Sequence, residues 1–200
     1  MTRAFERFAG WSAVLAALAG FVFTVAFAVV VEEEERWAEW VSWTALTLGG
    51  LVTLPVMAAL YYLLRGVEPE FALVGFVSGL AGALGAAIHG AFELSVLANP
   101  PDPGGPSAVD PRGFATFVLT GLAFVVFGWL GLRTGRLPAI AARLALAAAV
   151  LLVVVYVARL TVLDPKTNVI RAAALASGLA VIPAFYLLLA RSLLRDANSA

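Results

Sequence analysis

The chain has 200 residues, of which 62% are hydrophobic and 13% charged, and its thirteen basic and thirteen acidic residues give a formal net charge of zero. A water-soluble domain carries about a quarter charged residues, so a chain with a mean hydropathy of +0.96 cannot have water as its main solvent. The charge balance argues against nucleic acid as a partner, and the absence of cysteine excludes disulfides and thiolate chemistry.

Six apolar stretches, each long enough to cross the hydrocarbon core of a bilayer as a helix, occupy most of the chain. Their apolar residues run continuously instead of alternating, which favours helices over a membrane β-barrel. The sequence therefore predicts an all-α, polytopic membrane protein, a six-transmembrane-helix bundle that forms a single domain over residues 1–200. The expected spans are 8–31, 43–64, 71–98, 113–132, 137–163 and 169–194.

The first span has an alternative interpretation, because Ala26-Phe27-Ala28 after a basic amino terminus is similar to a signal-peptidase site. The apolar region of a signal peptide is about 7–15 residues long, and this stretch is longer. We therefore expect a helix that is retained in the membrane.

The second and sixth spans each contain a proline near mid-span, Pro55 and Pro183. Proline removes a backbone donor and frees a carbonyl one turn earlier, so both helices should bend. Such breaks sometimes line a cavity, although most are structural kinks. At the start of the second span, Trp37, Trp40 and Trp43 are expected to anchor the helix at the interface, with stacking of an aromatic ligand as the alternative.

Small residues mark the faces on which helices approach closely in lipid, and they are most frequent in the third span. We expect spans one, three and four to form the tight centre of the bundle. Packing within the chain is the main interpretation, and docking of a second copy or of another membrane protein is the alternative. The expected helix-packing residues of the third and fourth spans are Gly75, Gly79, Gly82, Gly121, Gly128 and Gly135.

His89 and Glu93, on the third span, are the candidates for chemistry. His89 is the only histidine of the chain, and Glu93 is the only acid well inside a span. Four residues apart, they share a helix face near the outer interface. An unpaired acid in hydrocarbon is costly, so Glu93 needs a proton, water or a cation. Arg159 on the fifth span is the expected cation, with Tyr156 as a nearby hydroxyl donor.

Three functional interpretations of this pair stay open beside a purely structural polar contact: a ligand pocket, a proton-titrating pair and a metal site. The metal site is the weakest of these, because one imidazole and one carboxylate do not fill a coordination sphere. One histidine also cannot supply both axial ligands of a bis-histidine haem. We therefore expect no metal and no cofactor.

Two polar connections flank the outer ends of the spans. The segment 99–112 is rich in proline and glycine and is expected to be a connector, with a lid over an outward-facing pocket as the alternative. The acidic run 32–35 is expected to be a solvated turn, with attraction of cations to the outer mouth as the alternative.

Basic residues set the expected orientation, since cytoplasmic segments of membrane proteins carry an excess of them. An N-in/C-in arrangement places more arginines inside than outside, which predicts a bacterial inner (plasma) membrane protein with both termini in the cytoplasm. The inner set is Arg3, Arg7, Arg65, Arg133, Arg136, Arg143, Arg191 and Arg195, and the outer set is Arg36, Arg112, Arg159, Lys166 and Arg171.

The stretch 128–138, with sequence GWLGLRTGRLP, resembles a segment of small, uncharacterised six-span bacterial membrane proteins. In those proteins an aromatic-rich helix ends in an arginine-containing turn, and a Leu-Pro pair begins the next span. The resemblance implies a small multi-span bacterial membrane protein and transfers no site residue.

These features favour a non-enzymatic protein that binds or transports a small molecule. One alternative is an assembly or regulatory subunit of a larger membrane complex, with Gly121 and Gly128 as its contact face. The other is a membrane-interface enzyme with His89 as base and Glu93 orienting it, which lacks an evident nucleophile. The expected partners are the lipid bilayer, a small-molecule ligand, and a membrane protein or a second copy of this chain.

Overall fold

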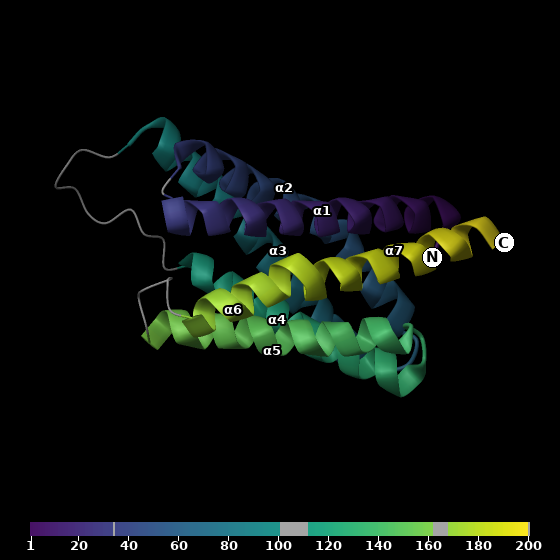
Figure 1. The fold of residues 1–200 in the computed structure, drawn as a ribbon. Helices are drawn as coiled ribbons and strands as arrows, with labels where there is room; N and C mark the ends of the chain where they lie inside the picture. Colours follow the sequence, from purple (N-terminus) through teal and green to yellow (C-terminus); the bar gives the residue numbers. More distant parts are fainter. Residues whose placement is uncertain (34, 101–111, 162–167, 200) are drawn as a thin grey trace.

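The computed structural model of the protein describes residues 1–33, 35–100, 112–161 and 168–199, and all regular structure in these residues is helical. Six helical rods of the described chain are long and apolar enough to cross a membrane. The expected all-helical architecture is therefore confirmed, with α6, η1 and α7 together forming the last rod (Figure 1). The elements are α1 (Arg3–Glu33), α2 (Arg36–Leu64), α3 (Pro69–Ala98), α4 (Arg112–Thr134), α5 (Ala139–Thr161), α6 (Asn168–Ala176), the π-helical turn η1 (Ser177–Val181) and α7 (Ile182–Ser199).

The helices extend beyond the apolar stretches where the flanking sequence contains no residue that breaks a helix. The second span was expected to begin at 43, but α2 begins at Arg36, because residues 27–48 contain neither glycine nor proline. Within the acidic run 32–35, Glu33 is the last residue of α1 and Glu35 is the N-cap of α2, and Glu34 lies outside the described residues.

The spans form a ring in chain order. Each packs mainly against its neighbours in the sequence, and the last span returns to α1, which lies between α2 and α7 (Figure 1). Both chain termini lie at one end of the bundle, together with the connections 65–68 and 135–138 (Figure 1). We call this the terminal end, and the opposite end, where α1, α3 and α5 finish, the distal end.

The prediction that spans one, three and four form the tight centre is wrong. Within the described residues, α1 makes no close backbone contact with α3 or α4, and its small residues face α2 and α7 instead. A Cβ added at Gly10 would lie 2.8 Å from Leu194 of α7, and one added at Gly49 of α2 would lie 3.2 Å from Ala19. A stripe of small residues indicates that a close approach occurs, but it does not specify the partner helix.

The glycines of α3 lie at backbone crossings with both of its neighbours. A Cβ at Gly90 would lie 2.8 Å from the Thr47 nitrogen of α2, and one at Gly82 would lie 2.9 Å from the Thr120 nitrogen of α4. Gly79 lies where α2 and α4 both approach, and Gly75 faces α4. Side chains on α3 therefore hold a fixed register against two helices at once.

The three glycines expected to form a packing stripe on α4 have two different roles. Cβ atoms at Gly121 and Gly128 would lie 3.4 and 2.8 Å from carbonyl oxygens of α5, so these glycines pack within the chain. Gly135 has a different role from the one expected from its spacing. It has a φ of +67°, no neighbour within 4 Å of an added Cβ, and an N–H that donates to the Gly131 carbonyl at 3.0 Å, so it terminates α4.

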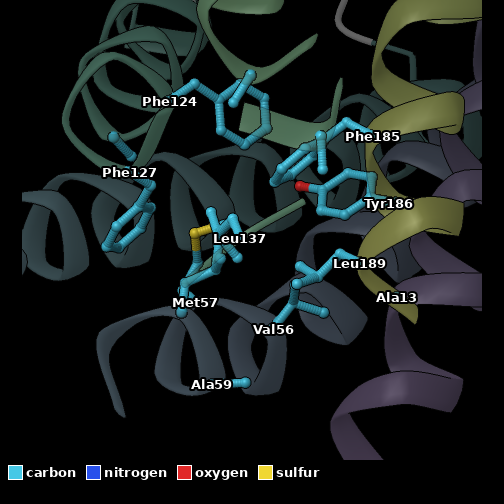
Figure 2. Packing of buried hydrophobic residues seen from close by; sticks show 14 of the residues in the cluster. Ala13, Val56, Met57, Ala59, Phe124, Phe127, Leu137, Phe185, Tyr186 and Leu189 are labelled. Atoms are coloured by element: carbon cyan, nitrogen blue, oxygen red, sulfur yellow. The ribbon is translucent and has the colours of Figure 1, made fainter. Parts of the chain in front are cut away.

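The largest fully buried hydrophobic side chains among the described residues lie in the terminal half of the ring. Phe124 and Phe185 meet at 5.1 Å between ring centroids, and Phe127, Met57 and Leu189 lie around them (Figure 2). In the distal half, many of the buried positions carry small or hydroxyl side chains, although Val155 and Ile170 are buried there as well. Its buried positions include Thr24, Ala45, Gly50, Ala83, Ala87, Gly90, Thr116 and Ser177. The largest apolar side chains are thus concentrated in the terminal half of the interior.

The α2–α3 crossing predicts a difference between two Gly→Ala variants. A Cβ at Gly50 would lie 2.5 Å from the Ala83 oxygen and 2.6 Å from the Ala87 nitrogen, whereas nothing lies within 4 Å of one at Gly20. We expect Gly50→Ala to lose about 1–3 kcal/mol of unfolding free energy by overpacking, measured as a lower midpoint of thermal unfolding in detergent. Gly20→Ala should leave the midpoint unchanged or raise it. Equal midpoints would contradict this crossing.

Candidate functional site

His89 and Glu93 lie one turn apart on α3, as their spacing predicts. His89 Nδ1 is 3.9 Å from Glu93 Oε1, and the two side chains are 18% and 19% exposed. This distance is too long for a hydrogen bond, but a protonated imidazole there would be attracted to the carboxylate in a medium of low dielectric constant. The two side chains are therefore close enough for the charge of one to affect the other.

The rotation of α3 directs this pair toward the interior of the ring. Gly85 faces α4 and Gly90 faces α2. Successive helical residues are about 100° apart, so His89 and Glu93 lie on the shorter arc between these two contacts. Ile88, on the opposite arc, is 66% exposed. The pair thus faces the interior of the ring, and not its outer surface.

An aromatic side chain of α2 contacts the imidazole, and two aromatic side chains of α1 contact that residue in turn. The Trp43 ring of α2 lies 5.6 Å from the His89 ring at an interplanar angle of 74°. Phe23 and Phe27 of α1 each lie 6.3 Å from Trp43. We call Phe23, Phe27, Trp43, His89 and Glu93 the distal cluster. It gathers residues from three helices at the end of the bundle away from the termini.

The three tryptophans expected to be interfacial anchors do not behave alike. Trp37 and Trp40 are 57% and 39% exposed, whereas Trp43 is half-buried and belongs to the distal cluster. Sequence reasoning grouped them because they recur every three residues. Only the packing of α2 against α3 separates the third from the other two.

Tyr156 and Arg159 lie on α5 at the same level as the pair. Gly85 contacts Thr116 of α4, and the contact of Gly121 with the segment 149–153 of α5 sets the antiparallel register of α4 and α5. Thr116 lies five residues from Gly121 toward the distal end, so the residue of α5 at its level is about five residues beyond the segment 149–153. That residue is Tyr156, which is half-buried. Arg159 follows one turn later in α5, and its side chain lies outside the described residues.

Sequence reasoning missed a polar bridge across the interior. Tyr186 of α7 is 5% exposed, and its side chain hydrogen-bonds with Thr53 of α2, although α1 separates these two helices in the ring. The Thr53 hydroxyl also donates to the Gly49 carbonyl at 2.8 Å. Figure 2 shows the Tyr186 hydroxyl directed toward the interior, beside Phe185. A tyrosine inside a span, three residues after Pro183, was the available signal.

The bend expected at Pro183 takes the form of the π-helical turn η1. The Ile182 N–H donates to the Ser177 carbonyl, five residues earlier. The side chain of Thr24 of α1 lies against Gly178, which accommodates the widened turn, and its hydroxyl donates to the Gly20 carbonyl at 2.8 Å. Turns of this kind occur frequently at functional sites. Pro55, in contrast, lies within an uninterrupted α2.

Among the described side chains, no three histidine, cysteine, aspartate or glutamate residues come close enough together to hold a metal ion. Comparison of the chain with protein-family models, with curated proteins and with solved structures found no match. The resemblance of the segment 128–138 to uncharacterised bacterial membrane proteins therefore stays an expectation, and the site has to be interpreted from its own geometry.

The proximity of His89 and Glu93 predicts energetic coupling. In a double-mutant cycle of His89→Gln and Glu93→Gln at pH 5.5, we expect an interaction of at least about 0.5 kcal/mol in the unfolding free energy. The control cycle pairs His89→Gln with Ser95→Ala, since Ser95 is exposed and its hydroxyl donates to the Phe92 carbonyl. Detergent unfolding curves supply the energies. Additive effects in the first cycle would show that the two side chains act independently.

Proposed function

We propose that the protein is a non-enzymatic plasma-membrane protein that binds a small molecule at the distal end of the bundle, through His89 and Glu93. The observation that carries this proposal is the position of the pair. An acid and an imidazole face the ring interior in the distal half, away from the fully buried aromatic side chains of the terminal half. Ionisable groups inside a span are expensive and typically functional.

The closed terminal half supports a binding site that is reached from one side only. Phe124, Phe127 and Phe185 are fully buried there and occupy the centre of the ring (Figure 2). A ligand at the pair would therefore enter and leave through the distal end in this conformation. Transport would require these aromatic side chains to separate, and the π-helical turn η1 supplies a weakened point in the last span.

Side chains at the terminal end support an orientation with the termini in the cytoplasm. At the terminal end, the Arg65 guanidinium lies 4.4 Å from the centre of the Tyr62 ring, and that of Arg133 lies 5.4 Å from the centre of the Trp129 ring. Arg133 also pairs with Glu68 at 3.2 Å. Arginines are in excess on the cytoplasmic side of membrane proteins, whereas tyrosine and tryptophan occur at both interfaces, so the arginines carry this argument.

The two alternative functions have less support. Gly121 and Gly128, the expected contact face for a partner protein, lie against α5 of the same chain. For an enzyme, the nearest hydroxyl in sequence is that of Ser95, which is exposed and donates to the Phe92 carbonyl of its own helix. The two glycines therefore do not form a surface for a partner protein, and Ser95 is not placed as a nucleophile for His89.

The orientation predicts opposite labelling of two single-cysteine variants, since the chain has no cysteine of its own. Gly66 and Glu35 are exposed at the terminal and distal ends respectively. In intact cells, a membrane-impermeant maleimide should label Glu35→Cys and not Gly66→Cys, and permeabilisation should expose the second. The reverse pattern would overturn the N-in/C-in arrangement.

The proposed site predicts that a bound small molecule depends on the pair. Native mass spectrometry of the protein in mild detergent should show a co-purified small molecule that is lost in His89→Gln and in Glu93→Gln. Glu70→Gln, an exposed acid at the start of α3, serves as the matched control and should retain it. Identical spectra for all four proteins would remove the basis for a binding function.

A further inference from the structure

We propose that an apolar groove between α1 and α2 binds one phospholipid molecule with an ammonium-bearing, zwitterionic headgroup. One acyl chain lies in the groove, the Thr44 hydroxyl donates to an ester carbonyl, and the headgroup lies between Glu33 and Arg36 at the distal end. Neither His89 nor Glu93 takes part, so this inference goes beyond the proposed function and does not depend on it.

The groove lies on the outer surface of the ring. Its volume is about 550 Å³, which is within the range of small-molecule sites. The side chains of Leu15, Leu18 and Trp40 on its walls are exposed, so it opens toward the surrounding lipid and not into the interior. Its walls include Leu15, Leu18 and Val22 of α1 and Trp40, Thr44 and Val52 of α2.

The length of the groove matches one leaflet of a bilayer. Trp40 and Val52 are 12 residues apart, which is about 18 Å along a helix, and half of the hydrocarbon core is about 15 Å thick. Nearer the terminal end, Phe5 of α1 and Tyr62 of α2 are in contact, with ring centroids 6.3 Å apart. A groove of this length fits an acyl chain that enters from the distal interface, whereas a helix of a partner protein would need a surface across the whole core.

The Thr44 hydroxyl is a polar group in this groove that its own helix leaves without a hydrogen bond. The hydroxyls of Thr47 and Thr53, on the same helix, each donate at 2.8 Å to the carbonyl four residues earlier. That of Thr44 makes no hydrogen bond within the described residues, and its side chain is exposed. A hydroxyl without a partner in hydrocarbon is costly, so an occupant with an acceptor at this position gains a hydrogen bond.

The depth of Thr44 fits the ester groups of a phospholipid. Thr44 lies about 12 Å along α2 from Arg36, and the headgroup layer on each side of the core is about 5–7 Å thick. Thr44 therefore lies in the outermost turn of α2 within the core, and helical side chains point back toward the N-terminus, here the interface. Ester carbonyls lie at this boundary, where they can accept from the hydroxyl.

Opposite charges lie above the two walls of the groove. On α1, Glu33 follows Val22 by about three turns, and on α2, Arg36 precedes Trp40 by about one turn, so each charged residue lies on the face of its wall. Glu33 and Arg36 are both exposed, and no ion pair joins them in the described part of the chain.

A headgroup with one ammonium and one phosphate complements these charges. The ammonium group would lie against Glu33, and the phosphate would accept from the Arg36 guanidinium. That guanidinium also donates to the Leu97 carbonyl at 3.5 Å, and its five N–H donors allow both contacts. Glu35, which is exposed as well, adds a second acid and disfavours an anionic headgroup.

Lipid titrations of the full-length protein test this inference. Delipidated protein in mild detergent is titrated with phosphatidylethanolamine or phosphatidylglycerol of the same acyl chains, and native mass spectrometry measures the one-to-one complexes. We expect an affinity for phosphatidylethanolamine at least about threefold higher. Thr44→Val keeps the shape and removes the hydroxyl, so it should weaken binding of both lipids about threefold. Glu33→Gln should abolish the preference between them.

Matched variants guard against indirect effects. Thr44→Phe places a ring in the groove and should weaken binding of both lipids by about tenfold or more. Val77→Phe adds a ring at an exposed position of α3 outside the groove and should bind both as the wild type does. Glu70→Gln removes an exposed acid at the terminal end and should keep the preference. Unfolding midpoints of all variants check that loss of binding is not loss of fold.

Several outcomes would overturn the inference. Equal affinities for the two lipids, or a preference that Glu33→Gln leaves intact, would overturn the headgroup assignment. Lipid binding that neither Thr44 variant weakens would overturn the groove as the site, and so would the absence of one-to-one complexes. A dimer that separates as lipid is added and is lost in Thr44→Phe would assign the groove to a second copy of the chain.

Discussion

At Gly50, Gly82 and Gly90 the backbone of α3 touches those of α2 and α4, because no side chain separates them. Burial of apolar surface drives no association between helices in lipid, so close packing of this kind supplies much of the attraction. It also fixes how far each helix slides and turns against the next. That register brings Trp43 beside His89 and directs Glu93 toward the interior. A bulkier residue at these glycines would separate the helices and disperse the distal cluster.

The same ring is filled unequally along its axis, and this follows from which residues occupy each half. Phenylalanine, leucine and methionine side chains of α2, α4 and α7 meet in the terminal half. In the distal half, hydroxyl groups such as those of Thr24, Thr47 and Ser177 donate to carbonyls of their own helices, which satisfies them at little cost. His89 and Glu93 are the ionisable pair of α3 that faces the interior there, and the proposed function follows from where they point.

Much of the architecture could be predicted because the period and length of apolar runs constrain helices in a membrane. The adjacency of His89 and Glu93 was equally predictable, since four residues make one turn. The neighbours of α1 were not predictable, because small residues indicate close approach without naming a partner. The role of Gly135 was predicted wrongly for a related reason. Its spacing of seven residues from Gly128 suggested a packing stripe, whereas its positive φ ends the helix. The link between Tyr186 and Thr53 joins residues far apart in the chain, and no local pattern connects them.

By itself, therefore, the sequence determined six helices long and apolar enough to cross a membrane and the presence of one acid–imidazole pair, because each of these depends on composition and on spacing along a single helix. Only the tertiary structure decided that the pair faces the interior, that Trp43 contacts the imidazole, and that the largest buried side chains lie in the terminal half. These features depend on the rotation and register of one helix against another, which are set by contacts between residues distant in the chain.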